Sequence, residues 1–175
     1  MAFRLPAQED TAGTYLESLP YLSSLINLRL AKGQPEGETA RIWDDILHNV
    51  FPGKDNYSTG PEMLMGAGRA DLFTAHLVLD TRFQEKKFLI VECKASGLET
   101  QNDIWATGVE QLEQYLGSIS GHHRKFGALA VGKCVRFYEW KDGVLHDMAD
   151  GEIFYLDRQC RTVMRHLVYF RENHG

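Results

Sequence analysis

Helical spacing of apolar residues is clearest in two segments of the chain. Between residues 43 and 50 they fall at i, i+3, i+4 and i+7, and Phe51-Pro52-Gly53 then ends the predicted helix. Between residues 102 and 119 they form one stripe, with Asn102 or Asp103 as the predicted N-cap. The stripes consist of Trp43, Ile46, Leu47 and Val50, and of Trp105, Val109, Leu112, Leu116 and Ile119.

Weaker patterns predict helices near both ends of the chain. Residues 14–30 are expected to form one helix, which the segment Gly33-Gln34-Pro35-Glu36-Gly37 ends. Asp157 is expected to cap a last helix that continues through Phe170. The first ten residues are expected to be a frayed terminus.

Strand patterning replaces helical patterning after residue 70. Residues 71–79 and 87–94 are rich in β-forming side chains, and the charged segment 80–86 joins them, which predicts a hairpin with a long turn. The run Phe88-Leu89-Ile90-Val91 is apolar on both faces and therefore predicts a central, buried strand.

Four further β segments are expected around this hairpin. Residues 126–131 and 134–140 predict a second hairpin across Gly132-Lys133, followed by a short strand after residue 143. One short strand is expected near residues 62–65. Because a helix joins the two hairpins, the crossover implies a mixed sheet with helices packed on it. The sequence thus predicts a single α/β domain over residues 1–175.

Composition and charge exclude several classes of protein. With 43% hydrophobic and 25% charged residues, the chain is neither disordered nor fibrous. A net charge of −5 argues against nucleic-acid binding by bulk charge alone. No apolar run reaches the length of a membrane span, so no membrane association is expected. The three scattered cysteines, Cys93, Cys134 and Cys160, predict a reducing, intracellular compartment and no structural zinc.

The candidate chemistry lies in the first hairpin. Glu92 and Lys94 are two residues apart in a strand, so they point to one face while Cys93 points to the other. Asp71 begins the partner strand and is expected opposite Glu92 or within a couple of residues. Two adjacent carboxylates are hard oxygen donors that suit Mg²⁺ or Mn²⁺, and a neighbouring amine can act on a water or a phosphate. The alternative is a solvated strand end without catalytic chemistry.

Short motifs follow one another between residues 38 and 140. Gly68-Arg69-Ala70-Asp71 precedes Ile90-Val91-Glu92-Cys93-Lys94, and Gln111-x-x-x-Tyr115 follows on the next predicted helix. The second hairpin, residues 130–138, comes after that helix. Together they resemble the PD-(D/E)XK nuclease superfamily, in its RecB-like branch with a Gln-x-x-x-Tyr motif. Ala70 stands where that family usually has a proline.

The resemblance implies a restriction-endonuclease-like core of αβββαβ order and metal-dependent hydrolysis of phosphodiester bonds, leaving 5′-phosphate and 3′-hydroxyl ends. It implies that Asp71, Glu92 and the backbone carbonyl of Cys93 hold Mg²⁺ or Mn²⁺, with Glu38 of the first core helix as a further candidate. Lys94 would assist the attacking water. Gln111 and Tyr115 lie one turn apart, from where they would orient Lys94 or touch a phosphate.

Some functional alternatives stay open at this point. DNA is favoured over RNA as substrate, although the site addresses a phosphodiester and not a sugar. The rival function is a catalytically silent module of the same fold that binds nucleic acid or a protein partner. Because the chain is acidic, a homodimer or a partner protein is expected to supply further phosphate contacts. The segment His122-His123-Arg124-Lys125 would contact phosphate or form a solvated loop.

Overall fold

The computed structural model describes residues 4–62 and 71–175, which form an α/β fold around one mixed, open sheet of seven strands. The strand order is β1-β2-β3-β4-β5-β6, and the short β7 pairs with β5. β3 and β4 are parallel, and the other neighbours are antiparallel. The predicted strand–helix–strand crossover is therefore confirmed as β3–α4–β4, with bounds Phe83–Lys94, Asn102–Ser118 and Lys125–Val131.

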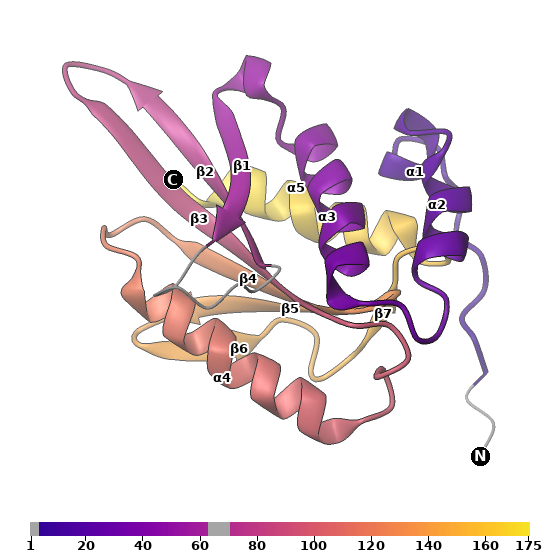
Figure 1. Cartoon of the computed structure of the whole chain (residues 1–175). Helices are drawn as coiled ribbons and strands as arrows, with labels where there is room; N and C mark the ends of the chain where they lie inside the picture. Colours follow the sequence, from indigo (N-terminus) through magenta and orange to yellow (C-terminus); the bar gives the residue numbers. More distant parts are fainter. Residues whose placement is uncertain (1–3, 63–70) are drawn as a thin grey trace.

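Helices cover both faces of the sheet. α3 (Glu36–Val50) and α5 (Cys160–Asn173) pack on one face, and α4 packs on the other (Figure 1). Alternate side chains of β3 divide between these layers, since Val91 and Cys93 lie in the α3 layer while Ile90 lies in the α4 layer. The strands thus carry two different cores.

The N-terminal helices differ from the prediction in one respect. Residues 14–30 form two helices, α1 (Tyr15–Ser18) and α2 (Leu22–Arg29), because Pro20 lies in the break between them. The stripe of residues 43–50 is confirmed in α3, whose inward residues are fully buried. A single-turn helix, η1 (Gly53–Asp55), then leads into β1 (Tyr57–Glu62).

The first hairpin projects from the body of the protein, as Figure 1 shows. β2 (Asp71–Leu79) and β3 are joined by the three residues 80–82, so the predicted long turn is wrong. Leu79 pairs with Phe83 at the tip, where their side chains are 73% and 65% exposed. A β-bulge shifts the register between Thr74 and Ala75, so that Phe88 is the extra residue of β3.

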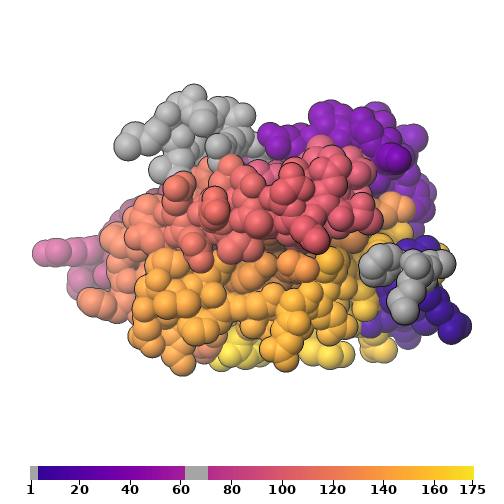
Figure 2. Space-filling view, turned by 90° about the horizontal axis from the view of Figure 1, so that it is seen from below, coloured from indigo at the N-terminus to yellow at the C-terminus, as the bar shows by residue number. Residues whose placement is uncertain are grey.

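α4 lies close to the sheet because glycines face leucines across the contact. A Cβ atom added at Gly108 would lie 2.5 Å from Leu129 Cδ1, and one added at Gly127 would lie 2.7 Å from Leu112 Cδ2. The two glycines therefore allow the helix and the sheet to approach closely. The N-cap is Gln101 without a side-chain cap bond, so the predicted caps at Asn102 and Asp103 are wrong. Figure 2 shows α4 lying along this face, with the hairpin extending beyond it.

The second hairpin and the strands after it complete the sheet. β4 pairs with β5 (Cys134–Lys141) across the two-residue turn, as predicted, with Gly132 at a φ of +55°. β6 (Val144–Asp147) and β7 (Phe154–Tyr155) both pair with β5. The predicted order of a helix, three strands, a helix and further strands is confirmed.

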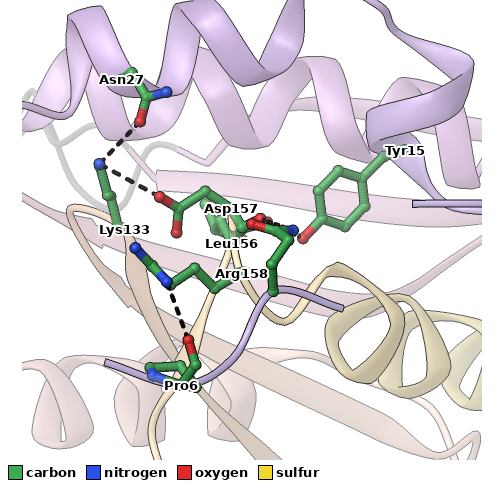
Figure 3. Close-up of polar contacts among 8 residues, drawn as sticks. Pro6, Tyr15, Asn27, Lys133, Leu156, Asp157 and Arg158 are labelled. Atoms are coloured by element: carbon green, nitrogen blue, oxygen red, sulfur yellow. Dashed lines mark hydrogen bonds and ion pairs between the residues drawn. The ribbon is translucent and has the colours of Figure 1, made fainter. Parts of the chain in front are cut away.

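Residues 6–10 are docked where a frayed terminus was predicted, and residues 1–3 of that prediction lie outside the described residues. Arg158 donates to the carbonyl oxygen of Pro6 at 3.2 Å, and Tyr15 donates to that of Leu156 at 2.7 Å (Figure 3). Asp157 pairs with Lys133 at 3.4 Å instead of capping α5, whose N-cap is Gln159. Both sequence expectations were wrong because tertiary partners took up these polar groups.

Two sequence expectations fall partly or wholly outside the described residues. The strand expected near 62–65 corresponds to β1 up to Glu62, and residues 63–65 lie outside. The motif residues Gly68, Arg69 and Ala70 also lie outside. In the part of the chain that the structure covers, no helix is long and apolar enough to cross a membrane.

Candidate active site

Three charged residues meet at the open end of the β2–β3 hairpin, as the sequence predicted. Leu72 pairs with Val91, and the antiparallel register places Asp71 beside Glu92. The alternation of β3 then directs Glu92 and Lys94 to the α4 face. Asp71 and Glu92 are each 1% exposed, so the solvated strand end weighed from the sequence does not apply to these carboxylates.

Both carboxylate oxygens of Asp71 accept hydrogen bonds. The backbone N–H of Cys93 donates to Oδ1 at 3.3 Å, and the hydroxyl of Tyr115 donates to Oδ2 at 2.7 Å. The first bond ties β2 to β3, and the second ties β2 to α4. Asp71 is therefore held in one orientation by the two elements that flank it.

Lys94 connects the second carboxylate to the helix. Its Nζ lies 3.1 Å from Glu92 Oε1 and donates to Gln111 Oε1 at 2.5 Å. The Lys94 side chain is 15% exposed, so this ammonium group reaches both solvent and the buried pair. The Gln-x-x-x-Tyr spacing thus places Gln111 on Lys94, which is one of the two roles expected of this pair, while Tyr115 bonds to Asp71, a contact that was not expected.

The site buries two acidic groups beside one cation. Burial, followed by the contact with Asp71, raises the pKa of Glu92 to about 8, while Lys94 acts in the opposite direction. Glu92 Oε2 is buried and has no hydrogen-bond partner among residues 4–62 and 71–175. Two carboxylates facing one ammonium group leave a strained arrangement that a cation would relieve.

Cys93 contributes its backbone to the site. Its thiol lies in the α3 layer and is 1% exposed. Burial, reinforced by the charges of Asp71 and Glu92, raises the pKa of the Cys93 thiol well above its ordinary value. The thiol is therefore a core side chain without nucleophilic character.

Glu38 lies in the first turn of α3 and is not joined to the other acidic residues in a cluster. Its Oε2 is buried without a hydrogen-bond partner in the described chain, and Arg41 Nη1 lies 3.6 Å from it. Among residues 4–62 and 71–175, no group of three His, Cys, Asp or Glu side chains is arranged to hold a metal ion. The structure brings Asp71 and Glu92 together, and it shows no three-carboxylate group with Glu38 among these residues.

One residue that supports the site was missed in the sequence. The hydroxyl of Thr39 donates to the backbone carbonyl of Lys94 at 2.8 Å and is fully buried. It ties the first turn of α3 to the end of β3. The signal was available, since Thr39 is the polar member of the row Thr39, Ile42, Trp43 and Ile46 on an otherwise apolar helix face.

Comparisons with known proteins give no name for this arrangement. No family model, no curated protein and no solved structure matches the chain.

Proposed function

We propose that the protein is a metal-dependent nuclease that hydrolyses phosphodiester bonds, with a restriction-endonuclease-like core. The observation that carries the proposal is the buried meeting of Asp71, Glu92 and Lys94, oriented by Tyr115 and Gln111. Such a group is costly to bury unless a ligand compensates its charge. Structural ion pairs in a core rarely leave a carboxylate oxygen without a partner.

The residues present fit a hard divalent cation. Glu92 Oε2 is a buried acceptor without a hydrogen-bond partner among the described residues, and Asp71 adds a second hard oxygen ligand beside it. Mg²⁺ or Mn²⁺ would be held by these carboxylates, with the backbone carbonyl of Cys93 as a further ligand. When bound, the ion would lower the pKa of a water molecule and offset charge on the phosphate.

The side chains divide the remaining work between them. Lys94 orients the attacking water and donates to the charge that develops on the phosphate oxygens. Gln111 accepts from Lys94 and fixes the direction of its ammonium group. Tyr115 keeps the Asp71 carboxylate turned toward Glu92. DNA is the proposed substrate, and RNA presents the same phosphodiester to this site.

A catalytically silent module that binds nucleic acid or a protein partner is the second candidate. The net charge of −5 favours a module of this kind that binds a protein partner, because an acidic chain gains little from long-range attraction to nucleic acid. The same charge supports a homodimer or a partner protein as the source of additional phosphate contacts. The buried, free thiols at Cys93, Cys134 and Cys160 fit a reducing compartment within the cell.

Cleavage assays test the proposal directly. Plasmid DNA, single-stranded DNA and RNA are incubated with the protein in Mg²⁺, in Mn²⁺ and in EDTA. We expect cleavage in metal and none in EDTA, and we expect Asp71→Asn to remove it. Activity that persists in EDTA, or in Asp71→Asn, contradicts the proposal. A chain that cleaves none of the three substrates and shows no response to Mn²⁺ is the silent module.

A further inference from the structure

A groove leads away from the candidate site between the end of α4 and the projecting hairpin. Its first hollow, of about 340 Å³, is lined by Tyr115, Ile90 and Lys87, among others. A second hollow, of about 570 Å³, is lined by residues that include Lys86 and His122. Glu85 and Ser120 line both, so the two hollows form one groove. We call this feature the strand groove.

The strand groove is continuous with the candidate site. Tyr115 lines its first hollow and also donates to Asp71, so one side chain borders both places. Ile90 precedes Glu92 by two residues and lies on the same face of β3. A linear substrate whose scissile phosphate lies at Asp71 and Glu92 would therefore have its neighbouring nucleotides at the mouth of this groove.

The charges of the strand groove differ in sign from those of the chain. Lys86 and Lys87 are half-buried along β3, and Lys87 Nζ also lies 4.3 Å from the centre of the Phe73 ring. Lys125 is 7% exposed and donates to the carbonyls of Gly121 and His123, and no ion pair to it is found among the described residues. Among the described residues that line the groove, two lysines, Lys86 and Lys87, thus accompany one acidic side chain, Glu85, in a chain of net charge −5, and Lys125 lies behind the wall at Gly121 and His123.

The groove wall is held in place by hydrogen bonds that remove other negative charge. His123 Nε2 donates to the carbonyl of Lys87 at 2.6 Å and fixes the loop against β3. The two carbonyls bound by Lys125 would otherwise add partial negative charge to the C-terminal end of α4. A polyanion can therefore approach this wall, although it lies at the unfavourable end of a helix.

We propose that the strand groove binds the sugar-phosphate backbone of the substrate strand next to the scissile phosphate, with Lys87 and Lys86 as the phosphate contacts. The inference rests on the proposed nuclease function and adds the path of its substrate. A polynucleotide is the partner that fits, because it carries one phosphate per nucleotide and so meets successive cations along a groove. Glu85 opposes the bound strand and weakens its binding.

The test is a salt titration of binding, with cleavage blocked by EDTA. A labelled single-stranded oligodeoxynucleotide is titrated at several salt concentrations with the wild type, Lys87→Met, Lys86→Ala and Glu85→Gln. Lys87→Met keeps the apolar stem over Phe73 and removes the charge. We expect each lysine variant to weaken binding several-fold and to lower the slope of log K against log salt by about one. Glu85→Gln is expected to strengthen binding.

Matched controls test whether binding depends on the groove lysines or on the overall charge of the chain. Arg161→Ala removes one exposed cation from α5, on the other face of the sheet, and is expected to leave both affinity and slope unchanged. Lys87→Arg is expected to restore the wild-type slope. Equal losses in Arg161→Ala and Lys87→Met, or an unchanged slope in both lysine variants, overturn the proposal. Displacement of the oligonucleotide by a polyglutamate chain of equal charge also overturns it.

Failure of this inference can be told apart from failure of the proposed function. If the protein cleaves in Mg²⁺ but both lysine variants keep the wild-type salt slope, the proposed nuclease function stands and the groove proposal is rejected. If binding depends on the groove lysines but no metal supports cleavage, the groove proposal stands and the proposed nuclease function is rejected.

Discussion

The two faces of the sheet carry different chemistry although the same strands build both. The α3 and α5 face is a continuous aromatic and aliphatic core, in which even histidines stack on rings, His174 on Phe88 at 4.1 Å and His166 on Phe137 at 4.6 Å. The α4 face has a smaller core around Leu112 and Leu129, and the charged site lies beside it.

The difference assigns separate tasks to neighbouring residues of one strand. Val91 and Cys93 are buried in the α3 layer, where they contribute to the stability of the fold. Glu92 and Lys94 alternate with them and face α4, where their charges lower stability and supply chemistry. Substitutions at the charged site on the α4 face should therefore change activity, and substitutions on the α3 face should change the free energy of unfolding.

The largest expected effect is the fall in the cleavage rate caused by Lys94→Ala. Loss of a donor to the transition state lowers the cleavage rate by about 10²–10³-fold, while the carboxylates still bind metal. The rate is measured with the best substrate found in the cleavage assays. The matched change on the other face is Ile46→Val, which should lower the free energy of unfolding by about 0.5–1.5 kcal/mol and leave the rate unchanged. Equal rates for the wild type and Lys94→Ala would refute the assignment.

The second effect is a metal-dependent rise in melting temperature. A cation that binds the folded state at a hundredfold excess over its Kd adds about 2.7 kcal/mol, which is several degrees for a chain of this size. Thermal melts with and without Mn²⁺ measure it, and Asp71→Asn or Glu92→Gln should remove most of the rise. A silent module predicts no rise with Mn²⁺ in the wild type and a loss of stability in both variants.

The third effect comes from the close approach of α4. Gly108→Ala places a methyl group against Leu129 and should lower the free energy of unfolding by about 1–3 kcal/mol. It should also lower activity, because Gln111 and Tyr115 move away from the strands. Gly117→Ala is the control on the same helix, where the nearest atom to the added Cβ is Trp140 Cζ2 at 3.4 Å. That variant should be neutral or slightly more stable. Similar losses in both variants would mean that the contact with Leu129 is not special.

The last effect is a pH dependence that belongs to the α4 face. The pKa of Glu92 is raised from its ordinary 4.5 to about 8, so the folded protein keeps this proton to a higher pH than the unfolded chain does. Its contribution to stability is complete below pH 4.5 and is lost as the pH rises toward 8. Denaturant unfolding of the metal-free protein measures this. Glu92→Gln should become more stable relative to the wild type between pH 5 and pH 9. If the difference in the free energy of unfolding between the variant and the wild type stayed constant with pH, burial would not perturb the pKa of Glu92.

The sequence predicted those parts of the fold that repeat a pattern over many residues. The stripes of α3 and α4, the buried run Phe88–Val91 and the alternation at Glu92 and Lys94 each depend on periodicity, which survives in the folded chain. The meeting of Asp71, Glu92 and Lys94 followed from that alternation and one hairpin. The contact of Gln111 with Lys94 was among those that the resemblance implied, whereas the bond of Tyr115 to Asp71 was not predicted.

What failed depended on single contacts between distant segments. Asp157 was expected to cap α5 but is held by Lys133 from the β4–β5 turn, and Thr39 bonds to Lys94 across the fold. The polar segment 83–87 carried no burial signal, because this part of β3 projects beyond β4. Hairpin pairing alone makes it a strand, and a charged strand without a covering layer resembles a loop in sequence.

The β-bulge at Phe88 adds one residue to β3, so odd-numbered and even-numbered residues exchange faces of the strand at that point. Phe88 and Leu89 both face the α3 layer. From the tip to Lys87 the odd-numbered residues therefore face α4, whereas after the bulge the even-numbered residues Ile90 and Glu92 do so. Loss of Phe88 would leave a regular ladder, in which Lys87 still pairs with Ala75 and every residue of the arm keeps its face. The bulge therefore lets β3 place one additional aromatic ring in the α3 layer without changing which residues of the arm face α4.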